Sequence, residues 1–221
     1  MVYGKRKCLL WLTLDRSHGA KLDTTGVRGV LGIFLPGGQL SYVRGAAGNH
    51  IKATLQAGLA DRDLLEERIA ELRSFIPTKA QITSYQTPVR DSGQRTSVLR
   101  FRFTSDSLRP IYNLLHPEGE REITRPALEI LGGRGAAWLW ADGCRPTDDG
   151  GAVLAHVGTL HDEAALVSGW LELLTGAPSA IATGWSRPRL HFTAEGARQL
   201  RSVLLPYAPQ SRKGLFLEER P

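Results

Sequence analysis

One stretch of this chain occurs twice. The segment Arg100–Pro117, RFRFTSDSLRPIYNLLHP, reappears as Arg189–Pro206, RLHFTAEGARQLRSVLLP. Each copy begins with alternating arginine and apolar residues, continues with a threonine suited to capping a helix, and closes with an amphipathic segment that ends at proline. Such a unit is a strand followed by a helix, and its repetition predicts two half-domains related by pseudo-two-fold symmetry.

The elements around this unit follow the same order in both halves, which is helix–strand–strand–helix–strand–strand–helix. In the first half we expect a helix over Val27–Leu35 capped by Thr24 or Thr25, strands over Gln39–Val43 and Asn49–Gln56, a helix from Asp61, strands over Ala80–Thr87 and Ser97–Thr104, and a helix over Ser107–Leu115. In the second half we expect a helix from Arg125, a small-residue helix over Gly135–Ala141, a strand over Ala152–Val157, a helix over Asp162–Leu174, a shorter hairpin that includes the strand Arg187–Thr193, and a helix over Glu195–Leu205.

This order predicts an α+β fold with two antiparallel sheets. The expected divisions are a basic N-terminal extension that contains a strand (1–23), two half-domains (24–118 and 126–210), a linker between them (119–125) and a basic tail (211–221). Because one chain supplies both halves, we expect a monomer. The two cysteines, Cys8 and Cys144, lack metal-ligand spacing, and neither a secretory segment nor a membrane-spanning run stands out, so we expect an intracellular protein in a reducing compartment.

The polar faces of the expected strands carry basic and amide side chains with almost no acid. The chain as a whole has 28 Lys and Arg against 22 Asp and Glu, a net charge of +6. Such faces suit phosphates and base edges, although any one-sided antiparallel sheet also shows a polar face to water. The candidate nucleic-acid contacts are Lys52, Thr54, Gln56, Gln81, Tyr85, Arg100, Arg102, Arg187, Arg189 and His191.

Two short segments carry a family resemblance. Ala136–Gly143, AAWLWADG, resembles the signature helix of LAGLIDADG homing endonucleases, and Gly32–Gly38, GIFLPGG, is its partner in the first half. The duplicated unit and the ending Leu205–Pro209 are similar to that family as well. The resemblance spans roughly residues 24–209. It implies two signature helices packed at a pseudo-two-fold axis through small residues, and two sheets that form a saddle for nucleic acid.

The resemblance also implies an acidic residue at the foot of each signature helix, where the pair binds Mg²⁺ for hydrolysis. Asp142 occupies that position in the second half, whereas Gly37 occupies it in the first, and no acid lies within 31–39. A divalent cation needs oxygen ligands from both sides. Asp142 is then either a remaining metal ligand or only a cap for its turn. We therefore expect no cofactor, with Mg²⁺ relevant only to residual nicking.

Other chemistry is sparse. His156, His161 and His191 are better suited to solvent or phosphate contact than to metal ligation, and residues 148–151 (DDGG) are typical of a hairpin turn. Trp138 and Trp140 are expected to pack in the signature helix, whereas Trp185 lies at a strand edge where it could stack on a base.

These observations favour a nucleic-acid-binding protein derived from a LAGLIDADG endonuclease and deficient in cleavage. RNA is favoured over duplex DNA only because family members that lose cleavage are reused in intron splicing, in RNA processing and in ribonucleoproteins such as a ribosomal assembly. The expected compartment is the cytoplasm or the matrix of a mitochondrion or chloroplast. One alternative is a DNA endonuclease or nickase that uses Asp142 and a divalent metal. The others are a DNA-binding regulator and a scaffold that docks on a protein.

Overall fold

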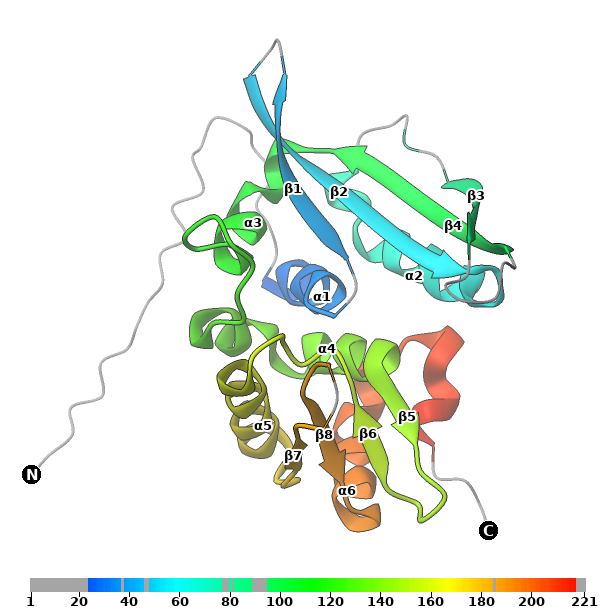
Figure 1. Ribbon diagram of the computed structural model, residues 1–221, viewed down its shortest axis with the longest axis vertical. Helices are drawn as coiled ribbons and strands as arrows, with labels where there is room; N and C mark the ends of the chain where they lie inside the picture. The colour runs from blue at the N-terminus through cyan, green and yellow to red at the C-terminus, as the bar shows by residue number, and fades with distance from the viewer. Residues whose placement is uncertain are drawn as a thin grey trace, which may run out of the picture.

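The computed structural model describes residues 24–36, 38–45, 48–76, 80, 82–88, 95–184 and 186–217. Two half-domains lie one above the other, each with a four-stranded antiparallel sheet and helices packed against it (Figure 1). The order of elements is the one predicted, helix–strand–strand–helix–strand–strand–helix in each half. The fold is therefore α+β with an internal repeat, as the duplicated segment indicated.

The first half contains the longer strands. Its elements are α1 (Thr24–Phe34), β1 (Gln39–Gly45), β2 (Gly48–Gly58), α2 (Arg62–Glu71), β3 (Ile82–Pro88), β4 (Arg95–Thr104) and α3 (Arg109–Leu115). A short 3-10 turn precedes both α2 and α3. Helix α2 lies behind the sheet in Figure 1.

The second half repeats this plan with much shorter strands. Its elements are α4 (Arg125–Gly143), β5 (Cys144–Pro146), β6 (Ala152–Leu154), α5 (His161–Thr175), β7 (Ala180–Ala182), β8 (Arg189–Phe192) and α6 (Ala194–Leu204). The turn between β5 and β6 is the hairpin turn expected over 148–151, closed by the Thr147 amide donating to the Gly151 carbonyl (3.1 Å).

The two sheets have equivalent strand orders, β1-β2-β4-β3 and β5-β6-β8-β7. In the first sheet Thr54 pairs with Arg102, and in the second Val153 pairs with His191. Residues that pair directly share a face, and alternate residues of a strand share that face too. The register therefore places one buried face and one open face on each sheet.

Helices α1 and α4 pack side by side between the two sheets (Figure 1). A Cβ atom added to Gly32 would lie 2.6 Å from the Cα atom of Gly135, so the two backbones touch where the sequence has glycine. Trp138 and Trp140 are 5 % and 1 % exposed and pack in the core, as predicted. The small residues of the signature helices thus serve the close approach that the resemblance implied.

The two helices predicted between Arg125 and Ala141 are present, because α4 is broken at Gly132, whose non-helical backbone has a φ of 55° that suits glycine. Two other expectations for the second half differ in detail from the structure. The strand expected over Ala152–Val157 ends at Leu154, because His156 adopts a positive φ of 63° and breaks the extended backbone. Arg187 precedes β8 instead of lying on it.

The end of the described chain packs against the first half. Residues Gln210–Phe216 form a 3-10 helix whose Phe216 is buried, and Arg212 forms an ion pair with Asp61 just before α2. The basic tail therefore joins the two halves, at least as far as residue 217. Within the described ranges, every helix is too short or too polar to cross a membrane.

Candidate nucleic-acid interface

The open face of the first sheet carries no acidic side chain along its described strands. Leu99, Phe101 and Phe103 of β4 point into the core, so Arg100 and Arg102 between them point outward. The register adds neighbours from the other three strands to this face. They are Gln39, Ser41, Lys52, Thr54, Gln56, Thr83 and Tyr85.

The candidate contacts on this face differ in exposure. Gln56 and Arg102 are exposed, and Lys52 is half-buried. Thr54 lies on the face but is only 8 % exposed, so its neighbours cover it. Gln81 lies outside the described residues.

Arg100 is held in place by an aromatic ring. Its guanidinium carbon lies 3.6 Å from the centre of the Tyr85 ring, a cation–π contact between neighbouring strands. The Arg100 Nε atom is buried without a hydrogen-bond partner in the described part of the chain. A stacked arginine is restricted to few rotamers, so the Tyr85 ring holds the Arg100 guanidinium on the open face of the sheet.

The second sheet presents a smaller basic face. The pairing of Val153 with His191 and of Ala182 with Arg189 places both candidate side chains on the open face. His191 is exposed and Arg189 is half-buried. Arg145 lies on the same face, opposite Val153, and was not among the predicted contacts.

The acid of the second signature helix is paired with a buried arginine of the first half. Asp142 lies in the last turn of α4, and a terminal nitrogen of Arg68 in α2 donates a hydrogen bond to its carboxylate. The Arg68 side chain is 4 % exposed and the Asp142 side chain 16 %. Asp142 therefore compensates a buried positive charge, a role that differs from both a metal ligand and a turn cap.

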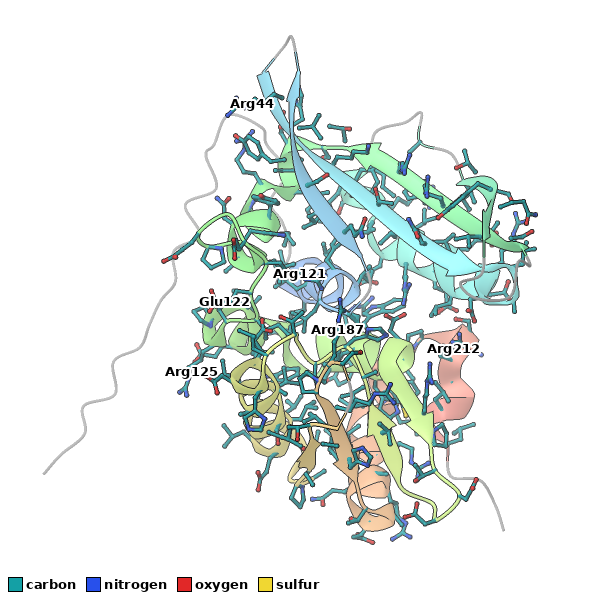
Figure 2. All side chains as sticks on the ribbon, in the orientation of Figure 1. Arg44, Arg121, Glu122, Arg125, Arg187 and Arg212 are labelled. Atoms are coloured by element: carbon teal, nitrogen blue, oxygen red, sulfur yellow. The ribbon has the colours of Figure 1, made fainter. Side chains whose placement is uncertain are left out.

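The foot of α1 is surrounded by positive charge. Arg121 donates to the carbonyl oxygens of Phe34 (3.0 Å) and Leu35, at the end of the helix where the carbonyls lack intrahelical partners. Burial lowers the pKa of Arg121, Glu163 opposes this, and the nearby Arg187 lowers it further. Figure 2 shows Arg121 and Arg187 together near the end of α1, between the two halves.

His156 lies in the same region. Burial lowers the pKa of its imidazole, Asp142 opposes this, and Arg187, Arg145 and Arg121 lower it further. The imidazole is therefore neutral at pH 7, and the arginines supply the positive charge at this junction. His161, the first residue of α5, and Asp148 are exposed.

The donor set at the feet of the signature helices does not fit a divalent cation. Mg²⁺ needs several oxygen ligands, and the carboxylate of Asp142 at this position is bound to a guanidinium. Gly37, the residue at the corresponding position of the first half, lies outside the described residues and has no side-chain ligand in any case. Among the described residues, no three His, Cys, Asp or Glu side chains come together as a metal site. Trp185 is also outside the described residues.

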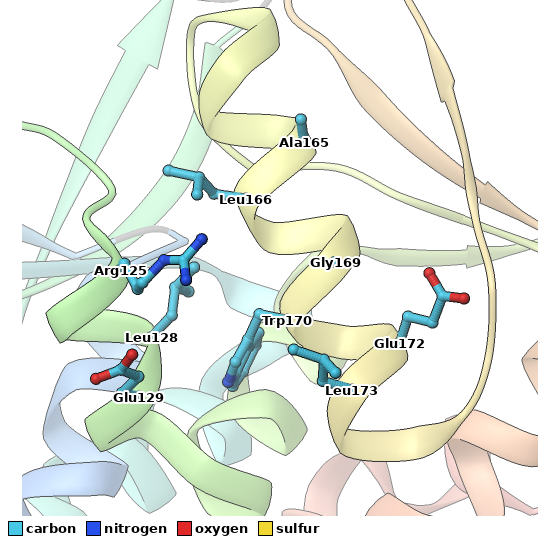
Figure 3. A pocket seen from close by; sticks show the side chains of 9 residues that line it. All are labelled: Arg125, Leu128, Glu129, Ala165, Leu166, Gly169, Trp170, Glu172 and Leu173. Carbon is cyan, nitrogen blue, oxygen red and sulfur yellow. The ribbon is translucent and has the colours of Figure 1, made fainter. Parts of the chain in front are cut away.

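A hollow lies between α4 and α5. Figure 3 shows its lining, in which Arg125, Leu128 and Glu129 come from α4 and Leu166, Trp170 and Leu173 from α5. The charged side chains here are of both signs, so this hollow does not extend the basic surface.

Sequence reasoning missed Arg68 and Arg121. Arg68 follows Leu64 by four residues and precedes Leu72 by four, so it interrupts the apolar stripe of α2. A charged residue in such a stripe indicates a buried partner, and that signal was present in the sequence. Arg121 lies in a charged linker without any pattern, and its contact with α1 spans 86 and 87 residues.

Comparison with solved structures gives the fold. The chain is similar to the homing endonuclease I-WcaI bound to its DNA recognition sequence, with a TM-score of 0.75, 12 % identity and coverage of 95 % of this chain and 97 % of that one. It also resembles the LAGLIDADG homing endonuclease I-GzeII in complex with its DNA target (TM-score 0.50, 9 % identity, 86 % and 87 % covered). A third match is full-length DUF199/WhiA from Thermatoga maritima (TM-score 0.50, 13 % identity, 86 % and 57 % covered). The chain therefore has the LAGLIDADG fold.

No protein-family profile and no curated protein matches the sequence.

Proposed function

We propose that this protein binds nucleic acid on the open faces of its two sheets and does not cleave it. The observation that carries the proposal is the absence of acidic side chains from the described strands of both open faces, which instead carry Lys52, Arg100, Arg102, Arg145 and Arg189. Positive side chains without acidic neighbours attract a polyanion and release its counterions. The structures similar to this one include two complexes with DNA, which agrees with this use of the fold.

The lack of cleavage is proposed from the two signature-helix positions. Asp142 is committed to Arg68, and Gly37 offers no carboxylate. Metal-assisted hydrolysis requires a cation that polarises the phosphate and activates water. With Asp142 engaged by Arg68, the described residues offer too few oxygen ligands to hold that cation.

RNA is proposed as the target in preference to duplex DNA. The strands of the second sheet have three or four residues, about 10–13 Å, whereas β2 has 11 residues, about 36 Å. A long duplex site needs two extended sheets, but a short helix or loop of a folded RNA fits one long sheet and a small second contact. The alternative supported by the similar structures is a duplex DNA target, as in a regulator.

Binding under salt titration tests the proposal. Fluorescence anisotropy would compare structured RNA and duplex DNA, both recovered by crosslinking the protein in its native cells, over a range of salt concentrations without metal. We expect the Arg100→Gln/Arg145→Gln double variant, which removes one arginine from each open face, to bind more weakly. The slope of log K against log salt should fall by roughly 0.7–0.9 for each phosphate that the variant no longer neutralises.

The matched control is Arg62→Gln/Arg73→Gln, which removes two exposed arginines in and after α2, behind the first sheet. The control should leave the salt slope unchanged. If binding resists high salt, or if both double variants behave alike, the basic open faces do not carry the binding and the proposal is wrong. Cleavage of the recovered target on addition of Mg²⁺ would refute the second half of the proposal.

A further inference from the structure

A basic pocket lies at the foot of α1, below the edge of the open face of the first sheet. Its cavity has a volume of about 440 Å³, room for a phosphate group and several waters, each of which takes about 30 Å³. The polar side chains around it come from β1, β2, β4, the end of α3 and the linker. They are Gln39, Ser41, Lys52, Thr54, Arg102, His116 and Arg121.

The charges in this pocket have one sign. Lys52 and Arg102 lie on neighbouring strands, diagonally across the register that pairs Thr54 with Arg102, so their Cβ atoms are roughly 7–8 Å apart or less. Arg121 faces them from the linker. The described residues that line the cavity include no aspartate or glutamate.

The third cation is fixed in position. Arg121 is anchored by its hydrogen bonds to the carbonyl oxygens of Phe34 and Leu35, which also compensate the negative end of the α1 dipole. A guanidinium has five N–H donors, and these two bonds use only one of its nitrogens. The remaining donors can serve an anion that enters the pocket.

We propose that this pocket binds one phosphate group of the nucleic acid directly, without a metal ion. The inference rests on the proposed function, since the phosphate belongs to the bound strand. Two cationic side chains from the sheet and a preoriented guanidinium match a tetrahedral oxyanion, and arginine binds phosphate through paired hydrogen bonds. At the foot of α1, positive side chains thus neutralise the phosphate in place of a metal ion, which the residues here do not fit.

His116 provides a reporter inside the pocket. Its ring stacks on Tyr112 with 4.3 Å between centres, and its Nδ1 atom lies 3.1 Å from the Tyr112 carbonyl oxygen. Burial lowers the pKa of His116, the hydrogen bond to Tyr112 raises it, and Arg121 lowers it further. Lys52 and Arg102 also face the cavity, so an anion among these three cations would raise the pKa of His116.

The test is an NMR titration of the His116 ring in the full chain. The pH titration would be repeated with inorganic phosphate and with chloride at equal ionic strength, in the presence of EDTA. We expect phosphate, and not chloride, to raise the pKa of His116 in a saturable way. Arg121→Gln and Lys52→Gln should each abolish the response, and two variants are used because Arg121 also contacts α1. Arg73→Gln, behind the sheet, should leave it intact.

An oligonucleotide then distinguishes the source of the phosphate. A response of His116 only to RNA with a 5′-phosphate assigns the pocket to a strand terminus, whereas an equal response to RNA with a 5′-hydroxyl assigns it to a backbone phosphate. If RNA binds but neither RNA nor phosphate moves His116, the pocket proposal is overturned while the proposed function stands. If phosphate moves His116 but no nucleic acid binds, the proposed function fails instead.

Discussion

The pair between Arg68 and Asp142 predicts an unusual result for the residue at the signature acid position. In an enzyme of this fold, replacing a metal-binding acid would remove activity at little cost to stability. Here Asp142→Asn leaves the Arg68 guanidinium, 4 % exposed, without a compensating charge. The Arg68 Nε atom already lacks a hydrogen-bond partner in the described part of the chain, so it has no neighbouring acceptor that could replace the charge of Asp142.

The expected magnitude follows from the cost of an unpaired buried charge. Removing one partner of a buried ion pair costs about 3–5 kcal/mol. The value should lie near the lower limit, because asparagine keeps one oxygen that accepts the hydrogen bond and Asp142 is 16 % exposed. For a chain of this size, each kcal/mol lowers Tm by roughly 2–4 °C, so the variant should melt about 6–12 °C below the wild type.

Urea unfolding and calorimetry of four proteins would measure this effect: wild type, Asp142→Asn, Arg68→Met and the double variant. Because the double variant buries no isolated charge, it should be more stable than the Asp142→Asn variant, and the cycle should show a coupling of about 1–3 kcal/mol. If Asp142→Asn changes the free energy of unfolding by less than about 0.5 kcal/mol, as ordinary surface substitutions do, the ion pair has no structural role and our reasoning is wrong.

Three further predictions concern stability and reactivity. Glu163 accepts hydrogen bonds from the backbone of Ile123, Thr159 and Leu160. Burial raises the pKa of Glu163, but these hydrogen bonds outweigh burial and lower it. Glu163→Gln should therefore lower the free energy of unfolding by about 1–3 kcal/mol at pH 7. Because the pKa of Glu163 is lower in the folded than in the unfolded state, its stabilisation is complete above about pH 4.3 and is lost as the pH falls through the folded-state pKa. Equal free energies of unfolding for the wild type and Glu163→Gln in urea at pH 7 would contradict this prediction. Gly32→Ala should destabilise the protein by about 1–3 kcal/mol, because the added Cβ atom would meet the α4 backbone. The control is Gly169→Ala in α5, where a Cβ atom meets nothing within 4 Å, and it should stabilise the protein by up to about 1 kcal/mol. The same Tm shift for both variants would refute the close contact between α1 and α4. Burial raises the pKa of the Cys144 thiol to about 12, although Arg201 opposes this, so iodoacetamide at pH 8 should label the Cys144 peptide in mass spectra only after unfolding.

The repeat in the sequence was enough to predict the order of elements and the open faces. Alternation of arginine and apolar residues at 99–103 fixes which side of β4 is buried, and the register then assigns the partners on β2 and β3 to the same side. These features depend on local periodicity, which a sequence displays directly. The close packing of α1 and α4 was expected from the resemblance of the signature segments and is confirmed by the contact of Gly32 with Gly135.

The contacts that define the candidate site depend on distance in the sequence. Arg68 and Asp142 are 74 residues apart, and Arg121 reaches the carbonyls of α1 from a linker with no periodic pattern. Local patterns reveal that Arg68 is misplaced in an apolar stripe, but they do not identify which carboxylate compensates it.

The unequal sheets give the proposed binding surface a direction. With strands of 11 residues in one half and three or four in the other, the two ends of the molecule cannot be exchanged by the pseudo-two-fold rotation that relates the strand orders. A target bound across both halves would be read from one end to the other in a single orientation, so it need not be palindromic. The stretch of the target covered by the protein would be long on the side of the first sheet and short on the side of the second.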